Sequence, residues 1–402
     1  MPNPPNTPLD AIVAGHLCLD IIPDLSANDP EQFRRAFVPG RLVMAGDATI
    51  STGGPVSNVG LALHKLGMRV QLMAKVGDDL FGQVIRQIVD GHGPGLAKGL
   101  GVDPITHSSY SLVISPPGID RYFIYFPGAN DTFCAADVDQ QALGQARLLH
   151  FGYPPLLPQM LLDRGAQLAD TLRRAKASGL TTSLDMTMPD PTSPAGRADW
   201  SAILGAALPH VDIFLPSIEE ILFTLWRDRF DDLEQQAGGH SILPLITPQI
   251  LGEVSQALMD MGPAIVGLKL GDRGLYVRTA GQIRLTALGR AAPVHPATWA
   301  DREIWSPCFQ VHVVGTVGSG DATIAGFLTA LLRDFSPEEA INAAVAVGAC
   351  NVEAADTLGG IRSWADTLDR VAAGWAKHPM QSPASGWQWD EAHEMWCRAN
   401  IP

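Results

Sequence analysis

The sequence predicts an α/β protein built around a mostly parallel β-sheet. Short apolar segments that suit buried strands alternate with a segment of helical periodicity, as in residues 148–151, 160–178 and 180–185. Near the C-terminus, a valine-rich segment, a glycine loop and a helical pattern follow one another over residues 311–333. This alternation is typical of a parallel sheet whose faces are covered by helices.

The first predicted strand is the apolar run of residues 11–22, which Gly15 interrupts. Asp20 lies near the end of this run, and ligands of open α/β sheets bind beyond the carboxyl ends of the strands. Asp20 is therefore a candidate ligand-binding residue, and a simple turn aspartate is the alternative. Further strands are expected at residues 211–215 and 264–268.

Composition and charge restrict the class of protein. The 402 residues are 46% hydrophobic and 17% charged, which indicates a large core, and the formal net charge is -14. This charge disfavours nucleic acid and anionic membranes as partners, and no apolar run approaches the ~20 residues of a membrane helix. Five dispersed cysteines without metal-site spacing fit a reducing compartment, so we expect a cytoplasmic protein.

The pattern at the C-terminal glycine loop indicates chemistry. Residues 311–314 suit a buried strand, Gly318 and Gly320 allow a tight turn, and residues 322–333 carry apolar side chains at helical spacing. Loop amides and a helix N-terminus together form an anion site. An acidic residue there, Asp321, makes sense if it takes a proton from a nucleophile while the amides hold a phosphoryl group. The alternative is a simple helix cap.

Two blocks of the sequence resemble the signatures of the PfkB (ribokinase-like) carbohydrate kinases. The C-terminal block is Gly318-Ser319-Gly320-Asp321, followed by Ala322, Ala325 and Gly326. The N-terminal block runs from Gly53-Gly54-Pro55-Val56-Ser57-Asn58 through Leu66-Gly67 to Lys75-Val76-Gly77-Asp78-Asp79-Leu80-Phe81-Gly82. Both blocks occur in the family's order, and the resemblance covers about residues 10–365.

The resemblance implies a three-layer α/β/α sandwich with a mostly parallel sheet and a small β-sheet lid. The kinase body would comprise residues 9–22, 50–107 and 127–375, and the lid residues 23–49 and 108–126. Within the lid, residues 41–45 look like a strand, and residues 108–114 and 121–126 look like a hairpin. Residues 376–402, which contain three tryptophans, would be an appended tail that packs on the body or on a partner subunit.

The resemblance also implies an activity, which is transfer of the γ-phosphoryl group of ATP to a hydroxyl of a sugar or sugar-like substrate. Asp321 would be the general base, and the amides around Gly318, Ser319 and Gly320 would stabilise charge on the transferred group. The expected cofactors are ATP and Mg²⁺. The lid would exclude water, which otherwise competes with the sugar for the phosphoryl group.

Further site residues follow from matching positions. The expected sugar-binding residues are Asp20, Gly53, Gly54, Asn58 and Arg121. The expected nucleotide-binding residues are Lys269, Gly271, Gly274, Thr316, Asn342 and Gly348. Glu220 would help to place magnesium, directly or through water. As alternatives, Arg121 and Lys269 are solvated side chains, and Glu220 complements the dipole of its helix.

The chain departs from the family pattern at three positions. Gly315 stands where the family usually has Asp, and Ser217 and Thr187 stand where it often has Asn. The missing carboxylate at Gly315 puts activation by a monovalent cation in doubt. A nucleoside kinase of the same fold and a sugar- or nucleotide-binding sensor with little turnover therefore remain alternatives, and a homodimer is plausible by analogy.

Other enzyme classes fit the sequence less well. A P-loop needs a Gly-Lys pair, which the chain lacks, and a dinucleotide fingerprint needs Gly where Thr323 stands. Residues 227–247 and 289–307 have no clear periodicity and are expected to be long loops. Ser336 is predicted to begin a helix, because Pro337 and Glu339 complete a capping pattern.

Overall fold

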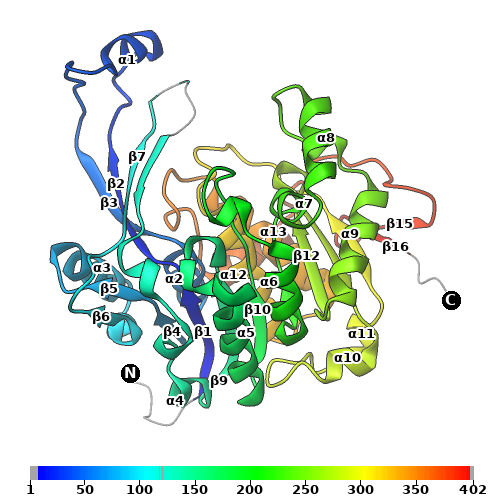
Figure 1. Cartoon of the computed structure of the whole chain (residues 1–402). Helices are drawn as coiled ribbons and strands as arrows, with labels where there is room; N and C mark the ends of the chain where they lie inside the picture. Colours follow the sequence, from blue (N-terminus) through cyan, green and yellow to red (C-terminus); the bar gives the residue numbers. More distant parts are fainter. Residues whose placement is uncertain (1–7, 117, 119–121, 399–402) are drawn as a thin grey trace.

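The computed structural model describes residues 8–116, 118 and 122–398 (Figure 1). Within these residues, ten strands form one large sheet, which is parallel from β4 to β12 and antiparallel beyond β12. Across the sheet, the strands are β15 (Trp387–Asp390), β16 (Met395–Arg398), β14 (Glu303–Ser306), β13 (Leu275–Thr279), β12 (Ile265–Lys269), β11 (Ile213–Phe214), β10 (Thr181–Leu184), β9 (Ala146–Gly152), β1 (Leu9–Gly15) and β4 (Val70–Met73).

Helices cover both faces of the large sheet. Side chains of β1 alternate between two cores, since Ala11 and Val13 face one and Ile12 and Ala14 face the other. The first core is shared with α2 (Pro55–Lys65), α12 (Ser319–Leu332) and α13 (Pro337–Asn351). The second core is shared with α5 (Leu162–Ala177), α6 (Trp200–Ala207), α7 (Ile218–Leu225) and α9 (Pro248–Asp260). The predicted three-layer α/β/α sandwich is confirmed.

The predicted first strand is two strands in two sheets. The chain leaves β1 at Gly15, which has a φ of +130° and packs against the backbone of Gly152, where no side chain would fit. It then enters β2 (Cys18–Pro23) of a smaller sheet. The apolar run of residues 11–22 therefore changes direction at Gly15, where the backbone of Gly152 leaves no room for a side chain.

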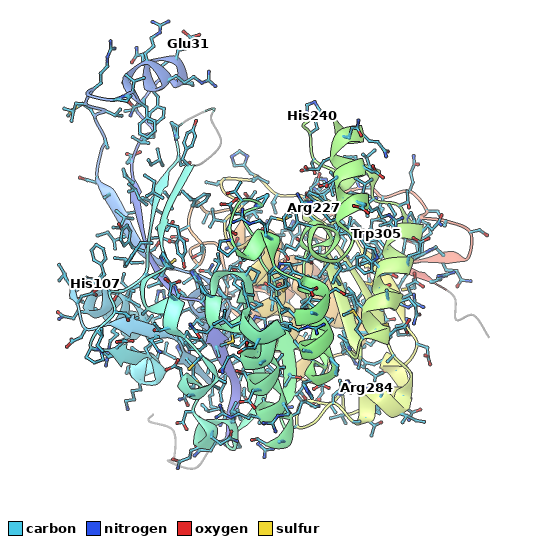
Figure 2. The ribbon with its side chains drawn as sticks, viewed as in Figure 1. Glu31, His107, Arg227, His240, Arg284 and Trp305 are labelled. Atoms are coloured by element: carbon cyan, nitrogen blue, oxygen red, sulfur yellow. The ribbon has the colours of Figure 1, made fainter. Side chains whose placement is uncertain are left out.

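The smaller sheet projects from the body as a lid (Figure 1). Among the described residues its strand order is β3 (Ala48–Gly53), β2, β7 (Tyr110–Ile114) and β8 (Tyr122–Phe126), and α1 (Pro30–Ala36) lies at its far end. Glu31 of α1 marks that end in Figure 2, well away from the body. The antiparallel pair of β7 and β8 confirms the predicted hairpin.

The expected lid strand at residues 41–45 is wrong. These residues have no regular structure, and β3 begins only at Ala48, which pairs with Pro23 at the end of β2. Leu42 and Met44 are exposed by 82% and 71%. An alternating pattern forms a strand only where a neighbouring strand accepts its hydrogen bonds, and β2 does not extend that far.

In the C-terminal half of the chain, three segments differ from the predictions. Residues 311–314 are not a strand, because β14 already occupies the place beside β13, and Val313 and Val314 are more than half exposed. The expected loop at 289–307 contains α11 (Pro296–Trp299) and β14 itself. The expected loop at 227–247 contains α8 (Arg227–Ala237), which buries Phe230 and Leu233.

The C-terminal tail extends the large sheet. Strand β16 pairs with β14, with Ile304 opposite Cys397, and β15 pairs with β16 at the sheet's edge, far from the lid (Figure 1). The buried Lys377 fastens the start of the tail, because its Nζ donates to Ser306 Oγ at 2.8 Å and to the carbonyl of His393 at 2.8 Å. Over the part of the chain that the structure describes, no helix is long and apolar enough to cross a membrane.

Candidate active site

Asp321 lies at the third position of α12 and is almost completely buried, with 2% of its surface exposed. Its Oδ2 accepts a hydrogen bond from Asn58 Nδ2 at 2.8 Å. The hydroxyl of Tyr153, just after β9, lies 3.0 Å from Oδ1 and 3.1 Å from Oδ2 and donates to the carboxylate. Three segments that are distant in sequence therefore meet at one carboxylate.

Burial raises the pKa of Asp321 above its usual range. The hydrogen bond from Asn58, the charge of Lys269 and the hydrogen bond from Tyr153 act in the opposite direction and stabilise the ionised form. A carboxylate that is buried yet hydrogen-bonded in this way can remain ionised and accept a proton more readily than an exposed one.

The glycine loop leads directly into this carboxylate. Gly318 is the N-cap of α12 and has a φ of +76°, and a side chain there would come within 3.0 Å of Thr357. Glycine is therefore required for both backbone and steric reasons. In the first turn of α12, the amide of Ser319 donates to the carbonyl of Thr316 at 3.3 Å, and the amide of Gly320 has no partner within the helix. This turn can stabilise an anion beside Asp321.

A cavity of about 250 Å³ opens on the outer side of the glycine loop. Of the predicted nucleotide-binding residues, it is lined by Lys269, Gly271, Gly274, Thr316 and Gly348, together with Ser319 and Gly320 of the loop. Asn342 is not among its lining residues, although it lies on the same helix, α13, as Gly348. Val311 and Val313, which were expected to form a strand, instead form part of the cavity wall.

Lys269 connects this cavity with the buried acidic groups. Its Nζ lies 2.6 Å from Asp185 Oδ1, and about 3.6 Å from the point where a β-carbon on Gly320 would lie. Burial raises the pKa of Asp185, and the charge of Lys269 opposes that shift. Burial alone would lower the pKa of Lys269, but the carboxylates of Asp185 and Glu220 outweigh it and raise the pKa. The ammonium therefore stays charged beside the start of α12.

Asp185 was not predicted as a site residue. It follows β10, at the carboxyl end of the parallel strands, which is the position where ligands of such sheets bind. Its side chain is fully buried, and Oδ2 has no hydrogen-bond partner among the described residues. A fully buried, unpartnered carboxylate oxygen is uncommon and marks a place where a ligand or a metal-bound water fits.

Glu220 caps its own helix. Its Oε2 accepts from the backbone amide of Ser217 at 2.7 Å, and Ser217 Oγ accepts from the amide of Glu220 at 3.2 Å. Burial raises the pKa of Glu220, and the charge of Lys269 opposes that shift. In the described part of the chain, no group of three His, Cys, Asp or Glu side chains is arranged to hold a metal ion.

The predicted sugar-binding residues come together where the lid joins the body. Asp20 lies on β2, and Gly53 on the neighbouring β3 leaves the space that the Asp20 carboxylate occupies. Gly54 has a φ of +88° and lies against His16, where a β-carbon would come within 2.5 Å of Nδ1. Asn58 is on α2, the helix that Gly54 precedes, and its side-chain amide donates to Asp321. Arg121 lies outside the described residues.

Burial raises the pKa of Asp20 to about 6, and the thiol of Cys18, which donates to Oδ1 at 3.3 Å, lowers it only in part. Asp20 is thus a carboxylate whose charge changes close to neutral pH. Above that pH both carboxylate oxygens accept hydrogen bonds from hydroxyl groups, and below it one oxygen carries a proton and donates, so fewer acceptor sites remain.

Four aromatic or polar side chains at this site were not predicted. His16 Nε2 lies 2.9 Å from the hydroxyl of Tyr125, which belongs to the lid strand β8. The ring of His16 also stacks on Tyr153, with 6.4 Å between ring centroids. Asn130 Nδ2 donates to the carbonyl of Leu17 at 3.0 Å and so fixes the turn that carries His16. No local pattern marks these side chains, because each acts on a distant segment.

Comparison with known proteins decides the family. A model of the pfkB family carbohydrate kinases matches residues 16–363. The chain belongs to this family. The predicted enzyme class, a phosphotransferase that acts on a hydroxyl group, is thereby confirmed, and the two signature blocks lie where the structure brings Asn58 and Asp321 together.

Curated relatives of this PfkB protein include plant fructokinases. Fructokinase-2 of Oryza sativa subsp. japonica is 25% identical over 220 residues, which are 54% of this chain and 60% of the rice protein. Fructokinase-2 of Zea mays is 24% identical over 324 residues, which are 80% of each chain.

Solved structures of the family share the fold at lower identity. Ribokinase of Arabidopsis thaliana, complexed with ribose and ATP, matches with a TM-score of 0.67 and 18% identity, over 90% of this chain and 98% of that one. A ribokinase II of E. coli, in complex with ATP and Mg²⁺, matches with a TM-score of 0.64 and 18% identity, over 91% and 99%. These matches confirm the ribokinase-like fold of the PfkB protein.

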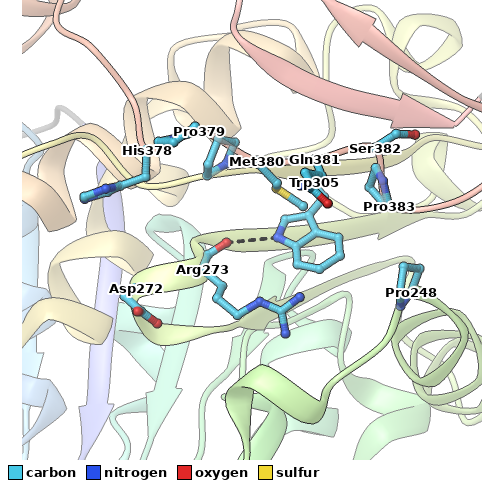
Figure 3. Close-up of a pocket in the computed structure, with 11 residues that line it drawn as sticks. Pro248, Asp272, Arg273, Trp305, His378, Pro379, Met380, Gln381, Ser382 and Pro383 are labelled. Atoms are coloured by element: carbon cyan, nitrogen blue, oxygen red, sulfur yellow. Dashed lines mark hydrogen bonds between the residues drawn. The ribbon is translucent and has the colours of Figure 1, made fainter.

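A second cavity, of about 470 Å³, lies beside the first in this PfkB protein (Figure 3). Asp272 and His378 line both cavities, and residues 378–383 of the tail form one wall of the second. Below the tail, Trp305 Nε1 donates to the carbonyl of Arg273 at 3.0 Å, and the Arg273 guanidinium lies 4.9 Å from the Trp305 ring centroid. The tail thus borders the predicted nucleotide site.

Proposed function

We propose that this PfkB protein is an ATP-dependent kinase that transfers the γ-phosphoryl group of ATP to a hydroxyl of a sugar, with Asp321 as general base. One observation carries the proposal. Asp321 is buried next to Gly320, which lines the same cavity as Lys269, and it accepts hydrogen bonds from Asn58 and Tyr153. A base in that place can serve a hydroxyl that attacks a phosphate.

In the proposed reaction, the substrate hydroxyl gives its proton to a carboxylate oxygen of Asp321. The hydroxyl oxygen then forms a bond to the γ-phosphorus, the bond from this phosphorus to the β–γ bridging oxygen breaks, and ADP leaves with that electron pair. Because burial raises the pKa of Asp321, its carboxylate is a stronger base than an exposed aspartate.

Charge on the transferred group would be stabilised from two directions. The amide of Gly320, in the first turn of α12, has no partner within the helix, and the ammonium of Lys269 lies beside this residue. Lys269 is held there by Asp185 before any nucleotide binds. A preorganised charge needs little rearrangement at the moment of reaction.

ATP and Mg²⁺ are the proposed cofactors, in line with the E. coli structure that contains both. Five of the six predicted nucleotide-binding residues line one cavity, which supports the nucleotide assignment. Mg²⁺, when bound with the nucleotide, would neutralise phosphate charge. The unpartnered Oδ2 of Asp185 and the carboxylate of Glu220 are the acidic groups that would help to hold it, directly or through water.

The proposed acceptor is a free sugar held by Asp20 and by the backbone at Gly53 and Gly54. The glycines let a sugar ring approach the main chain, and the carboxylate can accept hydrogen bonds from its hydroxyls. The fructokinase relatives favour a sugar over a nucleoside. A binding-only sensor is disfavoured, since such a protein has no need of a buried base.

The lid also supports a proposal of a homodimer. Strand β8 is the edge of the lid sheet, and Tyr122, Ile124 and Phe126 on it are exposed by 48%, 53% and 38%. An exposed apolar edge strand favours pairing with another strand. The free cysteines of the described chain are consistent with a cytoplasmic location.

The test is ADP release from ATP and Mg²⁺ with a panel of hexoses, pentoses, sugar acids and nucleosides, with Asp321→Asn measured in parallel. The expected result is turnover of one sugar and a loss of at least about a hundredfold in kcat for the variant. A variant that keeps full activity on a good substrate would show that Asp321 is not the base. Turnover of nucleosides alone would replace the sugar assignment.

A further inference from the structure

We propose that Tyr153 is a positioning residue for Asp321 and that, through His16 and Tyr125, it couples the base to the lid. The inference rests on the proposed role of Asp321. It is carried by one continuous path of contacts. Tyr125 of the lid meets His16, His16 stacks on Tyr153, and Tyr153 donates to the carboxylate of Asp321.

The backbone at Tyr153 is held in an unusual conformation. Its φ and ψ are +57° and +50°, a left-handed conformation that bulky residues rarely adopt, and the following residue is Pro154, which disfavours helical angles before it. The surroundings hold this turn in place. Gly152 packs against Pro55 so closely that no side chain fits, and the carbonyl of Tyr153 accepts from the amide of Leu156 at 3.0 Å. A constraint of this kind clusters at functional sites.

The conformation directs the phenol at the base. With Asn58 donating to Oδ2 and Tyr153 donating across both oxygens, the plane of the Asp321 carboxylate is fixed from two elements. Burial and the charge of Asp321 raise the pKa of Tyr153, so the phenol stays protonated and acts only as a donor. The surrounding charged groups are Lys269 on β12, Asp185 after β10 and Glu220 on α7.

The ring of Tyr153 also contacts His16, which in turn contacts Tyr125 of the lid. The rings of His16 and Tyr153 are stacked at 28° between planes, and His16 Nε2 lies 2.9 Å from the hydroxyl of Tyr125. Burial lowers the pKa of His16 to about 3, so the ring is neutral at any working pH and the contact is a hydrogen bond between neutral groups. A shift of β8 on lid closure would therefore be transmitted to the aromatic ring that holds the base.

Tyr153→Phe removes the hydroxyl and keeps the ring that stacks on His16. We expect kcat to fall by about ten- to a hundredfold, with the KM for sugar changed by less than about threefold, because the base is misplaced and the sugar contacts remain. Loss of a donor to the carboxylate also raises the pKa of Asp321, so the acid limb of the kcat/KM profile moves to higher pH. The matched control is Tyr122→Phe, on the exposed part of β8, which should leave both unchanged.

The lid coupling is tested with Tyr125→Phe alone and together with Tyr153→Phe. If the path is real, the double variant loses less than the product of the two single losses, because both changes interrupt one connection. Thermal unfolding of each variant confirms that it is folded. If the loss of kcat in the double variant agrees within about twofold with the product of the two single losses, the coupling is overturned.

The proposed function and this inference fail differently in the same assay. If Asp321→Asn is inactive but Tyr153→Phe keeps the kcat and pH profile of the unmodified enzyme, only the proposed role of Tyr153 is overturned. An active Asp321→Asn overturns the role of the base first. Loss of activity and a shifted acid limb in Tyr153→Phe, with inactive Asp321→Asn, supports both.

Discussion

The ammonium nitrogen of Lys269 lies 2.6 Å from Oδ1 of Asp185, beside the first turn of α12, and the side chain of Asp185 is fully buried while that of Lys269 is 14% exposed. The two residues come from the ends of β10 and β12, which β11 separates in the sheet. The pair therefore joins the carboxyl ends of parallel strands to the glycine loop. It places one positive charge at the cavity proposed to bind the nucleotide, close enough to Asp321 to lower the pKa of that carboxylate.

The first prediction concerns the stability of this pair. Asp185→Asn and Lys269→Met should each destabilise the protein by about 3–5 kcal/mol, because each leaves one buried charge without its partner. The double variant should lose clearly less than the sum of the two. Urea unfolding of the three variants measures the coupling free energy.

The matched control for this cycle is Asp231→Asn, which breaks the exposed pair with Arg227 on α8. Its expected cost is below about 1 kcal/mol, because exposed pairs are screened by water and salt. If the two buried single variants cost no more than this control, the buried pair does not carry the stability that its geometry implies.

The second prediction concerns the N-cap of α12. Gly318→Ala should lower stability by about 1–3 kcal/mol and lower kcat, since alanine is strained at a φ of +76° and its β-carbon would meet Thr357 at 3.0 Å. Thermal unfolding and steady-state assays measure the two effects. As a control, Gly205→Ala in α6 has open space around it and should stabilise the protein by about 0.5–1 kcal/mol. Equal effects of the two substitutions would contradict the prediction.

The third prediction is a pH dependence of sugar binding. Because burial raises the pKa of Asp20 to about 6, the carboxylate is ionised at pH 8 and protonated at pH 5. The dissociation constant of the sugar should therefore rise as the pH falls through 6, by up to about tenfold per unit. Calorimetry on the Asp321→Asn variant measures binding without turnover.

The same carboxylate has a predicted effect on stability. A raised pKa in the folded state means that the stabilising contribution of Asp20 is fully present below pH 3.8 and is lost as the pH rises through about 6. The control is Asp20→Asn, which should bind sugar more weakly at pH 8 and without this pH dependence. If sugar binding by the unmodified protein does not change with pH, Asp20 does not bind the sugar through its carboxylate.

The fourth prediction concerns the lid edge. Ile124→Lys on β8 should convert the proposed homodimer to a monomer, because a charge would have to be buried in the apolar contact. Light scattering after size-exclusion chromatography measures the mass. The control is Ile105→Lys, at a residue exposed by 87% outside the lid sheet, which should leave the mass unchanged. A monomeric unmodified protein would rule out the dimer.

Local sequence predicted those features whose causes are local. The helix start at Ser336 is confirmed, since Ser336 Oγ accepts from the Glu339 amide and the Glu339 carboxylate accepts from the Ser336 amide. Asp321 and the glycines before it were found because a tight turn, a helix N-terminus and an acidic residue share one short segment. Such patterns need no knowledge of the rest of the fold.

Partners across the fold were beyond local prediction. Tyr153 carries no motif, and its role depends on Asp321 and His16, which belong to distant segments. Asp185 stood in a recognisable place, but its partner Lys269 was expected to be solvated or to bind phosphate. Asn58 was expected to bind sugar, and its Nδ2 donates to the carboxylate of Asp321. Each assignment needs the position of a second element.

The sequence by itself determined the α/β fold, the family and the acidic residue at the glycine loop, because strand and helix periodicity and a compact motif are written along the chain. Only the tertiary structure decided which segments become strands and what each polar side chain contacts. Residues 311–314 have strand propensity but form no strand, since β14 fills the place beside β13, and Val311 and Val313 line a cavity. A strand needs a free neighbour, and a buried charge needs a partner, and both are supplied by residues far away in sequence.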